Sequence, residues 1–64
     1  NNLPDKSLNT KTIVYNDMNM IKPENHQELI KDVSQKTGLS VVDCKVGRIN
    51  YIENRANVKL YYKD

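Results

Sequence analysis

Residues 36–62 read KTGLSVVDCKVGRINYIENRANVKLYY, and this stretch decides the fold of the chain. Thr37 and Gly38 are typical of a helix end, because glycine takes the left-handed conformation that follows a last helical turn without a Cβ clash. Two runs of alternating apolar residues follow, separated by the short polar break ENR at residues 53–55. The stretch therefore predicts a helix that leads into a β-hairpin.

The first strand of this hairpin, which begins near Ser40, changes the phase of its apolar positions. The apolar side chains are on even positions at first and on odd positions later, namely Val42, Cys44 and Val46, then Ile49 and Tyr51. One extra residue between the two sets restores a single apolar face, so we expect a β-bulge at Gly47-Arg48. The second strand alternates without interruption, which predicts that Val58 and Leu60 point inward and Lys59 points outward.

Residues 11–21, KTIVYNDMNMI, carry the strand signal of the N-terminal half. Ile13, Val14 and Tyr15 are strong strand formers, and the apolar signal resumes after Asn16-Asp17, a pair that favours a turn or a bulge. The pattern fits one kinked strand or two short ones, and we favour one. The polar residues 1–10, NNLPDKSLNT, are expected to be a flexible linker, which leaves residues 11–64 as a single small domain.

A helix is predicted from Pro23 to about Lys36. Proline suits the first helical position because it has no N–H to lose there, and Glu24 behind it complements the positive end of the helix dipole. Four side chains recur at helical spacing and form one narrow stripe that can pack on a sheet, namely His26, Leu29, Ile30 and Val33. Gly38 ends the helix.

The resulting order is β-α-β-β, an α+β half-plait in which a three-stranded sheet carries one helix on one face. We expect the last strand to lie in the middle, antiparallel to both others. The opposite face of the sheet is then left without a covering element.

Composition limits the classes of function. A chain of 64 residues has room for one domain, and its formal charge of +2 is too small to imply nucleic-acid binding by itself. The lone Cys44 cannot form an intramolecular disulfide, and no apolar run approaches the length that spans a bilayer, so the chain as given is expected to be soluble. It begins with Asn1 rather than Met, which suggests a piece of a longer protein.

The residues that could carry chemistry have ordinary structural interpretations. His26 has no second ligand at metal spacing and is expected at the helix surface or core edge, and Cys44 falls on the apolar parity of its strand, as a buried thiol would. The acidic residues at 24, 28 and 32 are interpreted as a solvated helix face. We therefore expect no catalytic residues, cofactor, metal site or small-molecule substrate.

The uncovered face of the sheet is the candidate site. It is predicted to be basic with an apolar centre formed by Ile52 and Tyr61. The residues expected there are Lys45, Arg48, Asn50, Ile52, Lys59, Tyr61 and Lys63. Such a face can bind anions, stack bases or pair with another protein, and it can also be an ordinary solvated surface.

Several segments together resemble the C-terminal soluble domain of a family of uncharacterised bacterial multi-pass membrane proteins. The segments are YND at 15–17, IKPE at 21–24, LIKD at 29–32, TGL at 37–39, VGRINY at 46–51 and VKLYY at 58–62. The family is a domain of unknown function, encoded near polyphosphate-polymerase-like proteins. Where the resemblance leads us to expect an acidic residue after Gly-Arg-Ile, this chain has Asn50, which argues against a catalytic or metal-binding carboxylate there.

The resemblance implies a domain on the cytoplasmic side of a bacterial membrane. The leading hypothesis is a non-enzymatic domain that acts by protein contact or self-association through the uncovered sheet face. The alternative is an anion-binding module that recognises polyphosphate, nucleic acid or lipid head groups through its lysine and arginine side chains.

Overall fold

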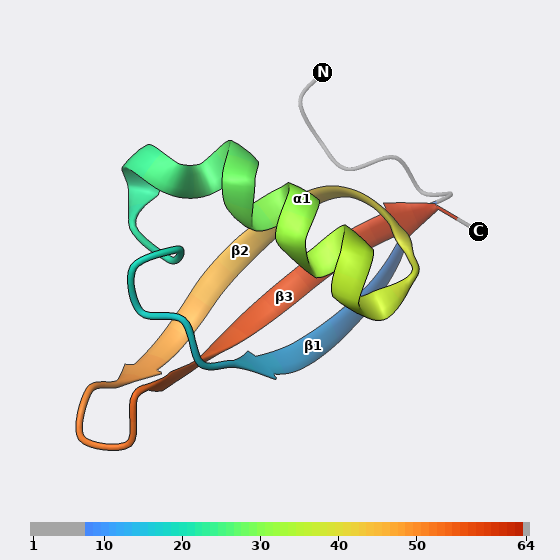
Figure 1. Ribbon diagram of the computed structural model, residues 1–64. Helices are drawn as coiled ribbons and strands as arrows, with labels where there is room; N and C mark the ends of the chain where they lie inside the picture. Colours follow the sequence, from blue (N-terminus) through green and yellow to red (C-terminus); the bar gives the residue numbers. More distant parts are fainter. Residues whose placement is uncertain (1–7, 64) are drawn as a thin grey trace.

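A three-stranded sheet with one helix across it forms the domain, as the computed structural model of residues 8–63 shows (Figure 1). In chain order the elements are β1 (Asn9–Tyr15), the short 3-10 helix η1 (Pro23–Asn25), α1 (His26–Thr37), β2 (Ser40–Asn50) and β3 (Arg55–Lys63). The strand order is β1-β3-β2, and β3 runs antiparallel to both of its neighbours. The predicted β-α-β-β order, the α+β class and the central place of the last strand are therefore confirmed.

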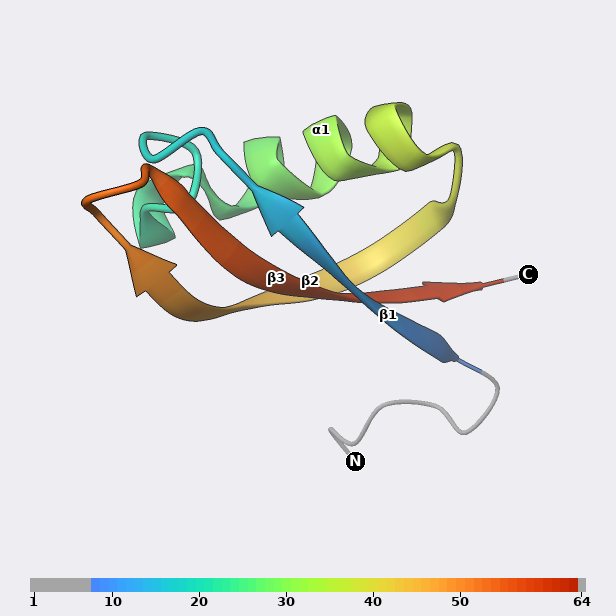
Figure 2. The same ribbon diagram turned by 90° about the horizontal axis from the view of Figure 1, so that it is seen from below.

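The core lies between α1 and one face of the sheet, with α1 on a single side of the strands (Figure 2). Val58 and Leu60 of β3 are 0% exposed, and Leu29 and Val33 of α1 are buried against the sheet. The alternation predicted for β3 is confirmed, and so is the apolar stripe predicted for α1 at Leu29, Ile30 and Val33, whereas His26 is partly exposed. The core is mainly aliphatic, with Tyr15 as its aromatic member, and the burial of these side chains stabilises the fold.

The β2 strand contains two irregularities in its pairing with β3, and one was predicted. The register shifts between Val46 and Ile49, which confirms the bulge expected at Gly47-Arg48. A second shift lies between Val41 and Asp43 and was missed. As a result Val41 is buried, whereas Val42, which was expected to point inward, is 44% exposed.

The prediction of one kinked strand through Ile21 was wrong, because β1 ends at Tyr15. The Asp17 carboxylate accepts hydrogen bonds from the backbone N–H groups of Asn19, at 3.1 Å, and Met20, at 3.2 Å, and this closes a turn. At its other end β1 begins at Asn9, inside the stretch expected to be a linker. Residues 1–7 of that predicted linker lie outside the described residues.

Helix α1 ends where the sequence predicts. Gly38 has a φ of 74°, in the left-handed region, and its N–H donates to the carbonyl oxygen of Ser34 at 2.9 Å. Pro23 begins the helical segment as expected, although the first three residues form η1 rather than α-helix. In the described part of the chain, neither helix is long and apolar enough to cross a membrane.

Candidate interaction surface

The uncovered face is the side of the sheet opposite α1, and no helix or strand of residues 8–63 packs on it (Figure 2). The β-strand register places every second side chain of each strand on this face. Its residues include Thr10, Thr12 and Val14 from β1, Lys45, Arg48 and Asn50 from β2, and Arg55, Asn57, Lys59, Tyr61 and Lys63 from β3, and the register also places Asp43 of β2 opposite Tyr61. Six of the seven predicted site residues are thus on one face, and Ile52 is not among them.

Two lysines occupy the middle of the uncovered face. Lys45 of β2 and Lys59 of β3 are directly opposite in the register, where Cβ atoms of facing residues are about 4.5 to 5.5 Å apart. No carboxylate of residues 8–63 forms a salt bridge with either lysine. The Lys59 ammonium is instead 5.5 Å from the centroid of the Tyr61 ring. Like charges that face each other across strands repel, so this pair does not stabilise the sheet.

A shallow hollow of about 240 Å³ lies at the hairpin end of the same face. Its lining includes Val14, Arg48, Asn50 and Arg55. The Arg55 guanidinium pairs with the carboxylate of Glu53, whereas Arg48 forms no salt bridge with the described residues. Val14 is 65% exposed and supplies the apolar part of this region. Val14 is not among the residues predicted for this face, because the strand formers Ile13, Val14 and Tyr15 follow one another and do not show which one points outward.

Ile52 and Tyr61 do not form the apolar centre that the sequence predicted. Strand β2 ends at Asn50, so Ile52 lies in the turn at residues 51–54 and not in the sheet. Tyr61 is near the opposite end of β3, facing Thr10 across the strands, roughly 20 Å from the hairpin turn at the rise of an extended strand. The prediction treated residues 50–52 as a continued strand, whereas the Asn50 side-chain oxygen accepts the N–H of Glu53 at 3.0 Å and begins the turn.

A family model described as Domain of unknown function (DUF4956) matches residues 1–62 of the chain. The chain belongs to this family. No curated protein and no solved structure matches it. The match confirms the coarse form of the resemblance, that of a domain of unknown function.

Three polar side chains where α1 crosses β1 of the DUF4956 domain are paired with one another. The Tyr15 hydroxyl on β1 donates a hydrogen bond to the Asp32 carboxylate on α1, which also lies 3.0 Å from the Lys36 ammonium. Burial and this hydrogen bond raise the pKa of Tyr15, and the same hydrogen bond, with help from Lys36, lowers the pKa of Asp32. Asp32 is therefore part of a helix-to-sheet contact, and its assignment to a solvated helix face was wrong.

The two residues most often associated with chemistry have structural surroundings in this domain. Cys44 is buried, as predicted, and desolvation together with the charge of Asp43 raises the pKa of its thiol to about 11. A thiol with a raised pKa is a poor nucleophile at neutral pH. The His26 Nε2 atom lies 3.1 Å from the Asp43 carboxylate, which links α1 to β2. No group of three or more metal-binding side chains occurs among residues 8–63.

Proposed function

We propose that this DUF4956 domain acts by binding and not by catalysis, and that its uncovered face contacts an acidic surface on a protein partner. The observation that carries this proposal is the facing pair Lys45 and Lys59, which lacks a carboxylate partner in residues 8–63. Such a pair lowers the stability of the isolated sheet, and an acidic partner would relieve the repulsion.

The remainder of the face supports a protein contact. The register places the lysine pair between Val14, which is opposite Asn57, and Tyr61. Val14 is largely exposed and Tyr61 is half-buried. Protein interfaces combine such apolar contacts with complementary charge at their edges. Stacking two copies of this basic face would bring like charges together, so the charge favours a different, acidic protein over self-association across this surface.

Site-specific photocrosslinking in the parent protein inside cells tests the proposal. A photoreactive residue replaces Asn57, which is exposed on the uncovered face, and the matched control replaces Lys31, which is exposed on α1. We expect a discrete crosslinked protein from position 57 that is absent from position 31 and is lost when Lys45→Glu is added. Equal crosslinking from the two positions, or none from position 57, would overturn the proposal.

A second candidate is an anion-binding module for polyphosphate, nucleic acid or lipid head groups. It is favoured by Arg48, whose guanidinium lines the hollow without a carboxylate partner in residues 8–63, close to the basic pair. Counterion release makes polyanion binding fall steeply with salt. We expect Arg48→Ala with Lys59→Ala to flatten that salt dependence in a polyphosphate titration. The control, Lys22→Ala with Lys31→Ala, removes the same charge elsewhere and should leave the dependence steep.

The parent protein and its location are part of the proposal. On the strength of the resemblance, we infer that the DUF4956 domain belongs to a membrane protein and faces the bacterial cytoplasm. The coding sequence upstream of Asn1 tests this directly, since each membrane-spanning helix needs about 20 apolar residues. Several such runs would support the inference, and a complete upstream sequence without them would remove it.

A further inference from the structure

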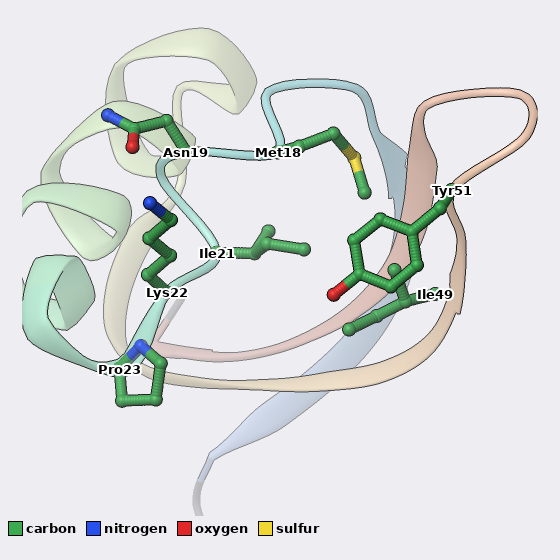
Figure 3. Close-up of a pocket in the computed structure, with 7 residues that line it drawn as sticks. All are labelled: Met18, Asn19, Ile21, Lys22, Pro23, Ile49 and Tyr51. Carbon is green, nitrogen blue, oxygen red and sulfur yellow. The ribbon is translucent and has the colours of Figure 1, made fainter.

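An apolar groove lies beside the β2–β3 hairpin, on the side of the sheet that carries α1 (Figure 3). Its volume is about 420 Å³, and it is lined by Met18, Asn19, Ile21, Lys22, Pro23, Ile49 and Tyr51. The side chains of Met18, Ile21, Ile49 and Tyr51 are directed toward one another across it (Figure 3). The groove is separate from the uncovered face, because its walls come from the hairpin and from the segment between β1 and η1.

Hydrogen bonds hold the segment that forms one wall of the groove. Besides the turn closed by Asp17, the Asn25 side-chain amide donates to the carbonyl oxygen of Asn19 at 2.8 Å, and the Lys22 N–H donates to the same oxygen at 3.3 Å. Ile21 is anchored in the core. The groove is therefore preformed, and filling it requires little rearrangement of the backbone.

The hairpin turn presents an isoleucine that is almost fully exposed. Ile52 is 94% exposed and Tyr51 is 72% exposed. Within the turn, the Asn50 side-chain oxygen accepts the Glu53 N–H, and Asn54 takes a positive φ of 54°. Tyr51 forms a wall of the groove while its neighbour Ile52 does not enter it. An exposed apolar side chain and an apolar groove thus occur at the same end of one molecule.

We propose that two copies of the domain pair through this end, with Ile52 of each copy inserting into the groove of the other. A two-fold axis satisfies both contacts at once, since the same surface serves both copies. The charges agree with this arrangement. Glu53 follows Ile52 on the turn, whereas Lys22 lines the groove and forms no salt bridge with the described residues. Glu53 also pairs with Arg55 of its own hairpin, and that pair lies at the edge of the contact.

Sedimentation of the full 64-residue chain over a concentration series tests the pairing. The series should reach about 1 mM, because a contact built on two isoleucines falls in the weak range of affinity. We expect a reversible dimer, and Ile52→Asp should raise its dissociation constant at least about 100-fold, since each dimer loses two buried isoleucines. The control Val42→Asp changes an exposed valine on β2, away from the groove, and should leave the dimer intact.

A charge-reversal pair tests the register of the contact without touching its apolar part. Glu53→Lys alone should weaken the dimer, and Glu53→Lys combined with Lys22→Glu should restore it toward the wild-type dissociation constant. A fold check by circular dichroism accompanies each variant. Failure of the double variant to recover, with its fold intact, would show that Lys22 and Glu53 do not meet and would overturn the proposed arrangement.

Further measurements distinguish this pairing from self-association through the uncovered face and from binding to a lipid surface. Val14→Asp alters the uncovered face and should have no effect on the dimer, so a loss caused by Val14→Asp and not by Ile52→Asp would assign self-association to that face instead. A chain that remains monomeric throughout the series would overturn the pairing. Sedimentation with vesicles of anionic phospholipid tests whether the hairpin turn contacts a lipid surface instead of a second copy of the domain. A monomeric chain that binds them and loses binding with Ile52→Asp would assign the turn to a lipid surface.

Discussion

The two faces of β3 differ sharply although they alternate along the same strand. Val58 and Leu60 are fully buried under α1, whereas Lys59 between them is exposed and faces Lys45 of β2. On the covered face each side chain adds to the core, and on the uncovered face the central pair works against the sheet. The side chains that form the core and those of the proposed contact surface therefore lie on opposite faces of a single strand.

The pairing of polar side chains also differs between the two faces of the sheet. On the covered side Tyr15 of β1 is paired with Asp32 of α1, and at the edge strand β2 His26 of α1 is paired with Asp43, so each link joins α1 to a strand. On the uncovered side the ammonium groups of Lys45 and Lys59 have no carboxylate within the described part of the chain. A buried polar group without a partner lowers stability, whereas an exposed cation remains hydrated and is available for binding.

Truncating one residue on each face of β3 should give the largest difference in unfolding free energy between the two faces. Leu60→Ala should lower the free energy of unfolding by about 2 to 4 kcal/mol, because it leaves a cavity under α1. Lys59→Ala should change it by less than about 0.5 kcal/mol. Urea denaturation of both variants measures the difference. Similar losses in the two variants would show that the faces do not divide the two roles.

Removing the link from Tyr15 to the helix should have the next largest effect. Tyr15→Phe keeps the ring in the core and deletes the hydroxyl that donates to the Asp32 carboxylate. Hydrogen bonds to charged groups contribute about 1.5 to 3 kcal/mol, so the unfolding free energy should fall by that amount. Tyr62→Phe is the control, because Tyr62 is only partly buried beside the core. An equal loss in both variants would mean that the Tyr15 hydroxyl has no special role.

The hydrogen bond between Tyr15 and Asp32 should also make the unfolding free energy depend on pH. The pKa of Tyr15 is raised above its ordinary value of 10.0, so its contribution is complete below about pH 10 and is lost as the pH rises further. Cys44, whose pKa is raised from 9.0 to about 11, adds to the alkaline loss. The pKa of Asp32 is lowered, so its contribution is lost as the pH falls below about 4. Denaturation midpoints should decline at both extremes, with a smaller alkaline decline in Tyr15→Phe.

Most of the fold was predictable because each element carries its own local signal. The bulge at Gly47-Arg48 shifts apolar residues from even to odd positions, and that shift is visible in the sequence. The bulge between Val41 and Asp43 leaves no such trace, since Val41 and Val42 are alike and either one fits the buried position. A phase change can be detected only where the two candidate residues differ in polarity.

The candidate site was predictable only where it follows strand alternation. Six of the proposed residues are on the uncovered face, but Ile52 was misplaced because apolar periodicity does not show where a strand becomes a turn. The apolar signal at Met18 and Ile21 was taken for a strand, whereas these residues leave the sheet and form a wall of the groove. The link between Tyr15 and Asp32 depends on how the helix lies across the sheet, which no local pattern contains.

A smaller effect is expected at the end of α1, which fixes how the helix covers its face. Gly38→Ala should lower the unfolding free energy by about 1 kcal/mol, because a Cβ is disfavoured in the left-handed region. An added Cβ meets no atom within 4 Å there, so the loss would be purely conformational. The control is Gly47→Ala in the bulge, whose Cβ would make only ordinary contacts and which should be nearly neutral. A neutral Gly38→Ala would mean that α1 does not depend on this cap.

The smallest expected effect has the opposite sign and addresses the uncovered face directly. Lys59→Glu converts the facing pair with Lys45 from repulsive to attractive, so it should raise the unfolding free energy by about 0.2 to 1 kcal/mol. Lys59→Gln, which removes the charge alone, should give a smaller gain, and high salt should reduce both gains. If the face binds an acidic partner, Lys59→Glu should abolish crosslinking from position 57 although the domain has become more stable. A stability loss in Lys59→Glu would show that the two lysines do not oppose each other, and the main support for a binding role of this face would be gone.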